Sequence, residues 1–307
     1  FVKQQQTVCN FSSSDSWVIL SSIEQSIKRK IESVGTPLKD WDINIYRGVL
    51  TGCNEAFIIS TEKRDEILAN CETEEERART SELIRPILRG RDIKRYGYEW
   101  ANLYLIATFP ACRYDIDNYP AVKDYLVSFA EQNLRESGNN WVADLYLEDY
   151  CKQKLAQTGK FIEIKGKRIY IGNTAEKARK KTSNKWFETQ DSISYWEDFY
   201  KPKLFYADIT QQLNFCLCKE VMFCNNTTYF IATEDEKVLE HLHTYLNSPI
   251  VDWYYRTLSV QLGEKAVRMF SIYVLDIPVP SMAKGNDFYE ILKLTPSEID
   301  FIECREH

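Results

Sequence analysis

Two sets of residues have side chains that could do chemistry, and the first combines carboxylates with a lysine. Glu163 and Lys165 alternate in the stretch FIEIKGKRIYI, with Asp144 or Asp149 upstream. Two carboxylates on adjacent strands could hold Mg²⁺ while a lysine positions or polarises water, as in metal-dependent nucleases. So short a motif also arises by chance, and the same pattern predicts a plain β-hairpin over residues 161–171 with Glu163 and Lys165 facing solvent. A nuclease site at Asp149, Glu163 and Lys165 remains the alternative.

The second set combines cysteines with histidines. Its members are Cys216, Cys218, Cys224, His241 and His243. Structural zinc sites usually take two well-spaced pairs, commonly Cys-x-x-Cys. Cys216 and Cys218 are instead on one face of an alternating strand, where small buried side chains are common. The pattern favours a core strand over a zinc site.

Other catalytic and cofactor-binding motifs are missing from the sequence. It holds 3 histidines and lacks G-x-S-x-G, H-E-x-x-H and Asp-Pro-Pro-Tyr type signatures. A phosphate-binding loop would need a glycine-rich turn between a strand and a helix. Gly48 and Gly52 have a different spacing, and strand-forming residues 57–59 follow them. We therefore expect no cofactor site and no catalysis in this chain.

Bulk composition narrows the function classes a little. The 307 residues are 44% hydrophobic, enough for a sizeable core, and carry a net charge of -6. That charge argues against a protein that coats DNA through a global basic field. An odd count of 9 cysteines does not fit a disulfide framework, and we find no signal peptide and no run that could span a bilayer. These features predict a cytoplasmic protein that does not bind a membrane.

Positive charge is concentrated in two segments. Residues 84–96, IRPILRGRDIKRY, have five cations against Asp92, and residues 160–185 have nine against Glu163 and Glu176. A surface that carries such a cluster of cations can bind the phosphates of a nucleic acid. The alternative is that these charges are only solvated and bind no partner. Aromatic residues interleaved with the cations favour nucleic acid; they are Tyr96, Tyr98, Tyr170 and Trp186.

The elements that must position these residues mix strands and helices without a regular βαβ order. Helical spacing and caps predict helices over residues 22–33, 120–134, 235–246, 251–258 and 297–303. Alternation and β-branched content predict strands over residues 40–50, 56–60, 103–107, 161–171, 203–209, 214–223 and 228–232, and an extended end over 274–280. We expect Phe57, Ile59, Leu204, Phe205 and Leu246 in the core. The prediction is an α+β fold with a curved, largely antiparallel β region and packed helices.

Several stretches occur in an order that resembles a known family, the TaqI-like C-terminal specificity domain. This is the target recognition domain of adenine-specific DNA methyltransferases, and it also occurs in fused type II restriction-modification enzymes. The stretches are GVLTGCNEAFII, IRPILRGRDIKRY, NYPAVKDYL, WFETQ with FYKPKLFYADI, YLNSPIVDWY and LDIPVP. The resemblance covers the chain from about Trp17 to Pro280.

The resemblance implies that the chain is the DNA-reading part of a longer polypeptide. Residues 17–307 would be the specificity domain, and residues 1–16 the junction to an N-terminal methyltransferase domain. That domain would bind S-adenosylmethionine, and the whole enzyme would need Mg²⁺ if it also cleaves DNA. The implied partners are double-stranded DNA and the methyltransferase domain. Residues 139–185 exceed the family's usual connection, which predicts an insertion that either sets specificity or has a separate function.

The turn Thr51-Gly52-Cys53-Asn54 is the first candidate for DNA contact. Thr51 and Asn54 supply short hydrogen-bonding groups, and Gly52 would let the backbone approach a duplex closely. The alternative is a structural turn in which Asn54 caps its own backbone. Phosphate contacts would come from the first basic segment, whose cations are Arg85, Arg89, Arg91, Lys94 and Arg95. An internal pair between Arg91 and Asp92 is the alternative there.

Base-reading residues would lie on loops that vary within such a family. Asn, Gln and Arg suit adenine and guanine edges, so Gln211 and Gln212 are the first candidates. Asn173, Asn184 and Lys185 come next, and Lys203 is expected to point at the DNA backbone after Pro202 starts its strand. A protein-interaction subunit without a DNA role is the third function class.

Overall fold

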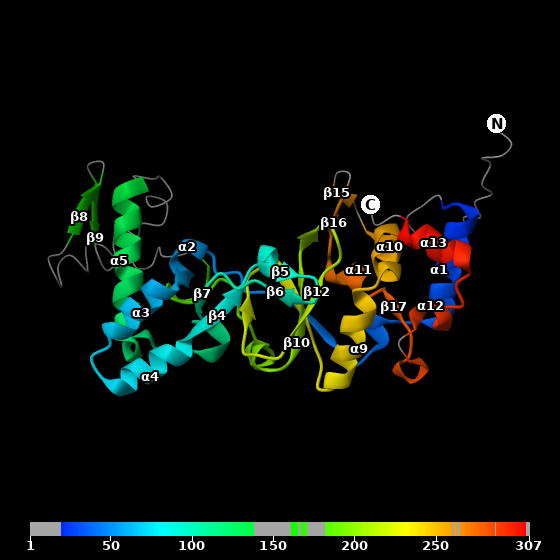
Figure 1. The fold of residues 1–307 in the computed structure, drawn as a ribbon. Coiled ribbons are helices and arrows are strands. Elements are labelled where there is room, and N and C mark those ends of the chain that lie inside the picture. The colour runs from blue at the N-terminus through cyan, green and yellow to red at the C-terminus, as the bar shows by residue number, and fades with distance from the viewer. Residues whose placement is uncertain are drawn as a thin grey trace.

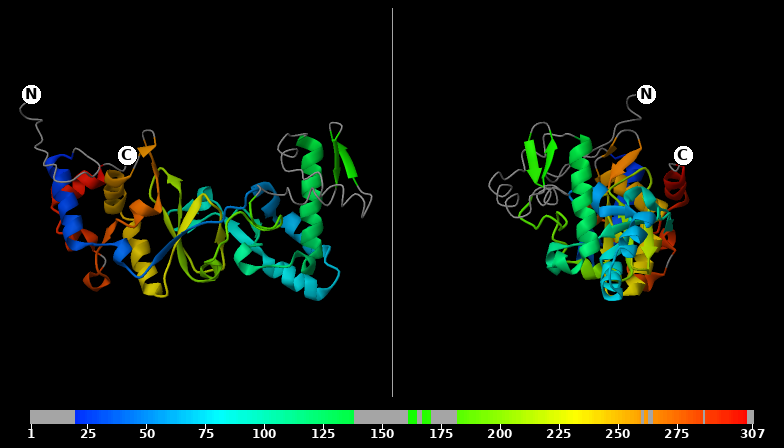
Figure 2. Two further views of the ribbon diagram at one scale, coloured as in Figure 1. Left: turned by 180° about the vertical axis from the view of Figure 1, so that it is seen from behind. Right: turned by 90° about the vertical axis from the view of Figure 1, so that its left-hand side faces the viewer.

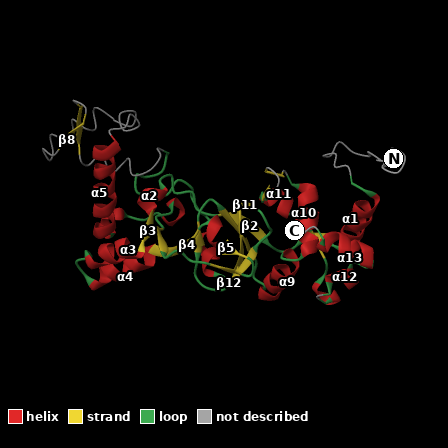
Figure 3. Cartoon of the chain, turned by 45° about the horizontal axis from the view of Figure 1, so that its top comes forward, coloured by secondary structure: helices red, strands yellow, loops and turns green. Residues whose placement is uncertain are grey.

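The computed structural model describes residues 20–137, 161–164, 167–170, 182–259, 261–262, 265–285 and 287–304. Within them the molecule is elongated, with helices at both ends and sheets between them (Figure 1). Viewed along its long axis it is much narrower (Figure 2). In the view tilted by 45°, most of the strands lie between the two groups of helices (Figure 3).

The central sheet has 4 strands in the order β12-β10-β14-β2, and each neighbouring pair is antiparallel. Its strands are β12 (Phe215–Cys218), β10 (Lys203–Ala207), β14 (Thr228–Ala232) and β2 (Asn44–Arg47). Side chains alternate between the two faces, so Phe205 and Phe230 join one hydrophobic core while Leu204 and Ile231 join another. Because both faces are covered, the strands β12, β10 and β14 are almost wholly apolar.

The first core lies between the central sheet and a second sheet of 4 strands, in the order β13-β4-β7-β3. These strands are β13 (Phe223–Cys224), β4 (Ile84–Leu88), β7 (Leu103–Ile106) and β3 (Ile58–Ser60), and only the β13–β4 pair is parallel among them. The helices here are α2 (Asn54–Phe57), α3 (Thr61–Ala69), α4 (Glu74–Leu83) and α5 (Pro120–Ser137). Buried Glu76 accepts the Ala121 N–H at 3.0 Å and so caps α5.

The second core lies on the opposite face of the central sheet, under most of the remaining helices. They are α1 (Ser22–Val34), α9 (Glu236–Leu246), α10 (Pro249–Leu258), α11 (Ser271–Val274), α12 (Phe288–Ile291) and α13 (Pro296–Glu303), with the pair β1 (Thr36–Pro37) and β17 (Pro278–Val279). Glu298 of α13 bonds to α1, because its carboxylate accepts from Lys30 at 2.6 Å and from Ser26 at 2.7 Å.

Smaller elements lie around these two cores. The three-stranded sheet β11-β16-β15 consists of β11 (Ile209–Thr210), β16 (Ala266–Arg268) and β15 (Gln261–Leu262), and two hairpins pair β5 (Ile93–Lys94) with β6 (Gly97–Tyr98) and β8 (Phe161–Ile164) with β9 (Lys167–Tyr170). The 3-10 turns are η2 (Leu38–Asp40), η3 (Gly90–Asp92), η4 (Pro110–Cys112), η5 (Ile116–Asn118), η7 (Trp196–Tyr200) and η8 (Met282–Lys284).

The structure confirms the α+β class and most of the predicted elements. All five residues expected in the core are buried: Phe57, Ile59, Leu204, Phe205 and Leu246. The prediction of one strand over 214–223 is wrong, because the chain leaves β12 and enters the second sheet as β13. The extended segment 274–280 is shorter than predicted, since α11 ends at Val274 and β17 starts at Pro278. Residues 1–16, and most of 139–185, lie outside the described residues, so the domain boundaries remain predictions.

Candidate nucleic-acid interface

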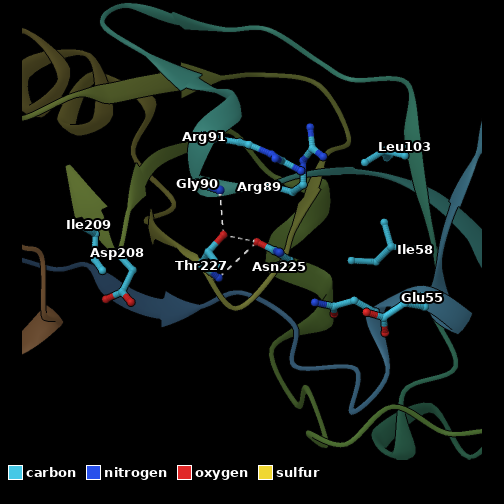
Figure 4. Close-up of a pocket in the computed structure, with 11 residues that line it drawn as sticks. Glu55, Ile58, Arg89, Gly90, Arg91, Leu103, Asp208, Ile209, Asn225 and Thr227 are labelled. Carbon is cyan, nitrogen blue, oxygen red and sulfur yellow. Dashed lines mark hydrogen bonds between the residues drawn. The ribbon is translucent and has the colours of Figure 1, made fainter. Parts of the chain in front are cut away.

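An open cleft of about 620 Å³ lies where the two sheets and the small β11-β16-β15 sheet meet. Figure 4 shows Asp208 and Ile209 on one side, Glu55, Ile58 and Leu103 on the other, and Gly90 and Thr227 between them. The remaining lining residues are Asn54, Arg89, Arg91 and Asn225. The cleft thus gathers three of the sequence-predicted candidates, Asn54, Arg89 and Arg91.

A tightly packed turn forms the floor of the cleft. The hydroxyl of Thr227 accepts the Gly90 N–H at 2.9 Å and donates to Asn225 Oδ1 at 2.6 Å (Figure 4). A Cβ atom on Gly90 would lie 2.6 Å from the Thr227 carbonyl oxygen, and one on Gly48 would lie 2.1 Å from that of Asn225. Backbone therefore meets backbone here, and only glycine fits at either position. A side chain at either position would push the two backbones apart.

The Thr51 turn is structural at one end and exposed at the other. Thr51 is fully buried; its hydroxyl donates to Asn54 Oδ1 at 2.8 Å and accepts the Cys53 N–H at 3.2 Å. Thr51 therefore does not face DNA, which corrects the prediction made for it. Gly52 has a φ of +83°, so it is required by the turn itself. Asn54 is exposed in the cleft, and its amide nitrogen makes no hydrogen bond among the described residues.

The first basic segment contains a buried ion pair that involves Arg89, whereas the sequence suggested Arg91. Asp92 is 4% exposed and accepts Arg89 Nε at 3.0 Å, Nη2 at 2.8 Å and the Arg89 N–H at 2.8 Å. This hydrogen bonding raises the pKa of Arg89. Residues three apart eclipse in a 3-10 turn, which brings Asp92 to Arg89. Arg91 is exposed and has no ion pair in the described part of the chain.

The other three cations of this segment also have partners. Arg85 stacks over the Tyr200 ring at 5.2 Å, and Arg95 donates to the Asn247 carbonyl at 2.8 Å. Lys94 is exposed and lies 3.5 Å from Glu99. None of these three lines the cleft. Most cations of the segment therefore have a partner within the fold, and Arg91 lines the cleft without an ion pair in the described part of the chain.

Lys203 is buried, so the prediction that it points to the DNA backbone is wrong. It has 0% exposure, and its Nζ donates to the carbonyls of Lys201 at 2.6 Å and Glu220 at 3.1 Å. Burial lowers the pKa of this lysine. The physical reason is its place in β10, the strand between β12 and β14, where Lys203 pairs with Cys218 and Ala232.

Gln211 and Gln212 are exposed and directly follow β11, whose Ile209 lines the cleft. Their backbones are held: the Gln211 carbonyl accepts from Arg256, and the Gln212 carbonyl accepts from the Thr210 hydroxyl. The side chains therefore project from a fixed loop beside the cleft. This is the arrangement expected of base-reading residues, although the contact itself remains a prediction.

The candidates on the segment after residue 139 are less well placed. Asn184 donates to the carbonyls of Thr189 at 3.0 Å and Gln190 at 2.9 Å, so its amide closes a loop. Lys185 is exposed, reaches the Tyr114 carbonyl at 3.5 Å and does not line the cleft. Asn173 lies outside the described residues. So do Asp149 and Lys165, while Glu163 is described as part of β8, and the nuclease alternative stays a prediction.

Reasoning from the sequence missed the acceptors of the cleft. Glu55 is exposed there, and Asp208 lies 3.7 Å from Arg268 with one buried carboxylate oxygen that has no hydrogen-bond partner among the described residues. Asn225 and Thr227 were also missed. Their turn-forming types were visible in the sequence, but their approach to Gly48 and Gly90 depends on the parallel β13–β4 pairing.

The cysteines considered for zinc are part of the first core, while His241 is buried and His243 is half-buried. Cys216 and Cys218 are buried on β12, where burial raises their thiol pKa values to about 12 and about 11. His241 makes a 2.8 Å hydrogen bond to the Pro280 carbonyl. Within the described ranges, no group of three or more His, Cys, Asp or Glu side chains could hold a metal ion. No helix there is long and apolar enough to cross a membrane.

Comparisons with known proteins identify one family and two similar structures. Residues 158–279 match the TaqI-like C-terminal specificity domain. The type IIG restriction endonuclease BpuSI is similar over 93% of this chain and 28% of its own, with 12% identity and a TM-score of 0.49. The type IIL restriction-modification enzyme MmeI, solved in complex with DNA, is similar over 78% of this chain and 25% of its own, with 12% identity and a TM-score of 0.43.

The chain spans about a quarter of the length of these two enzymes. At this identity and these TM-scores, the two similarities leave its function open. No curated protein matches the sequence. The family match contains Asp208, Ile209, Asn225 and Thr227 of the cleft. The similarity to the TaqI-like C-terminal specificity domain family therefore covers residues 158–279 of this chain.

Proposed function

We propose that this chain is the DNA target recognition module of a longer, adenine-specific DNA methyltransferase or fused restriction-modification enzyme. The observation that carries the proposal is the family match over residues 158–279, which covers β10, the Gln211–Gln212 loop and one wall of the cleft. The other wall, with Asn54 and Arg91, comes from outside the matched segment. The module would therefore include more of the chain than the match.

The chemistry of the cleft suits base edges better than phosphates alone. Arg91 and the Asn54 amide nitrogen are donors, while Glu55 and Asp208 are acceptors. In the major groove, guanine presents acceptors, adenine presents one acceptor and one donor, and cytosine presents a donor. A surface that carries only cations would bind every sequence equally. A mixed set of donors and acceptors can instead discriminate between base pairs.

The parent enzyme would supply the reaction. The sequence here has neither a glycine loop for S-adenosylmethionine nor a Pro-Pro motif for a flipped adenine, so we assign both to a separate methyltransferase domain. The partners would be double-stranded DNA and that domain, in the cytoplasm. The role of this chain would be to bind one short sequence and hold it in register for the catalytic domain.

The test is to express the full-length enzyme in a host without adenine methylation and to sequence the methylated positions in its genome. We expect methylated adenines within one short motif. Gln211→Ala and Gln212→Ala should relax at least one position of that motif, since a bidentate contact is worth about 1–3 kcal/mol of discrimination. Gln25→Ala, on α1, is the matched control and should leave the motif unchanged. If the host that expresses the wild-type enzyme shows no methylated motif, the proposed function is contradicted.

A further inference from the structure

One charged pair on α10 holds two separate segments beside the cleft. Arg256 Nε donates to Asp252 Oδ2 at 2.6 Å, one turn earlier on the same helix. Nη1 donates to the Lys265 carbonyl at 2.8 Å, and Nη2 donates to the Gln211 carbonyl and, more weakly, to Asp252 Oδ1 at 3.4 Å. One guanidinium therefore joins α10 to the loop after β11 and to the segment that enters β16.

Asp252 completes this arrangement from the other side of the loop. Its Oδ1 accepts the Leu213 N–H at 2.9 Å, two residues beyond Gln211. Two residues further along the loop, Phe215 bonds to buried Asn247: its N–H donates to Asn247 Oδ1 at 3.0 Å, and its carbonyl accepts from Asn247 Nδ2 at 2.8 Å. The backbone of residues 211, 213 and 215 is thus held by side chains of Arg256, Asp252 and Asn247 in turn.

The loop held in this way is the one that presents the exposed glutamines. Its backbone groups bond to α10, so the side chains of Gln211 and Gln212 remain free to face outward. Across the small sheet, Ile209 pairs with Arg268 on β16, and β16 follows Lys265 directly. The loop is therefore joined to β16 twice, by this strand pairing and through Arg256.

We propose that Arg256, oriented by Asp252, is a positioning residue that sets the register of the Gln211–Gln212 loop and so controls discrimination at the base pair that this loop reads. The inference rests on the proposed DNA-recognition function. Arg256 does not touch DNA in this account. Its planar guanidinium donates in fixed directions to the Asp252 carboxylate and to the carbonyls of Lys265 and Gln211. A lysine ammonium cannot reproduce this geometry.

The test uses the full-length enzyme with Arg256→Lys, Asp252→Asn, Gln211→Ala, Gln212→Ala and the double variants that combine Arg256→Lys with either glutamine change. Arg29→Lys is the matched control, because Arg29 is an exposed arginine whose Nε donates only to the Gln25 carbonyl of α1 at 3.2 Å. For each variant, kcat/KM for methylation is measured on the cognate duplex and on every duplex with one altered base pair. Melting temperature and the salt dependence of binding are measured alongside.

We expect Arg256→Lys to reduce the cognate preference about tenfold at one position, the same one that Gln212→Ala or Gln211→Ala relaxes, without changing the salt slope. The double variant with that glutamine change should be no more relaxed than the glutamine variant alone, since both changes act on one contact. Asp252→Asn should give the same pattern more weakly, and Arg29→Lys should change nothing.

Three outcomes would overturn the inference. The first is a uniform loss of activity at all positions, which a purely structural role would produce. The second is additive relaxation in the double variant. The third is an unchanged motif in the glutamine variants, which would mean that this loop reads no base. In each case methylation of a defined motif by the wild type would leave the proposed function intact.

Discussion

The first basic segment, residues 84–96, and the Gln211–Gln212 loop use their polar groups in opposite ways. In the segment, the side chains are occupied: Arg89 pairs with Asp92 and Arg95 bonds the Asn247 carbonyl. In the loop, the backbone is occupied by Arg256 and Asp252, and the side chains stay exposed. The amount of charge in a segment is therefore a poor guide to what it offers a ligand. What matters is which groups the fold has already bonded.

The largest expected effect separates the two arginines beside the cleft. Arg89→Ala should lower the free energy of unfolding by about 3 kcal/mol, because it leaves the buried Asp92 carboxylate without its partner. Arg91→Ala should change it by less than about 0.5 kcal/mol, as for most exposed positions. Urea denaturation measures both. Equal stabilities for the two variants would break the comparison, because Arg89 would then be as free as Arg91.

The second effect concerns DNA affinity and its dependence on salt. Arg91 brings positive charge to the cleft, so Arg91→Ala in the full-length enzyme should weaken binding on both cognate and scrambled duplexes. It should also flatten the salt slope by about one unit, since one fewer counterion is released. Lys203→Met should leave that slope unchanged, because Lys203 is buried in the central sheet. A flatter slope in Lys203→Met would return this lysine to the interface.

The smallest effect is a pH dependence that belongs to Lys203. Burial lowers its pKa in the folded protein, so the unfolded chain binds more protons between that lowered value and the usual 10.5. The contribution of Lys203 to stability should therefore rise with pH through this window and be least favourable below it. The measurement is the difference in unfolding free energy between wild type and Lys203→Met from pH 7 to pH 10. A flat difference would show that the ammonium is solvated, as it would be on a surface.

The sequence by itself determined the fold class and most of the elements. Alternation predicted β10 and β14, helical spacing predicted α1 and α9, and Pro120 marked the start of α5, because these signals depend on residues within a few positions of one another. Buried apolar residues such as Phe57 and Leu246 were equally predictable, since burial follows from the same periodicity.

Tertiary structure alone decided which polar groups remain for function. Lysine and threonine often contact DNA at a protein surface. Lys203 and Thr51 are instead buried by the strands and turns packed around them. The cleft itself joins Asn54, Arg91, Asp208 and Thr227 from four distant parts of the chain. A hydrogen bond or ion pair depends on distances between such parts, and no local pattern of residues records those distances. The hydrogen bond from Arg256 to the Gln211 carbonyl, between residues 45 positions apart, is an example.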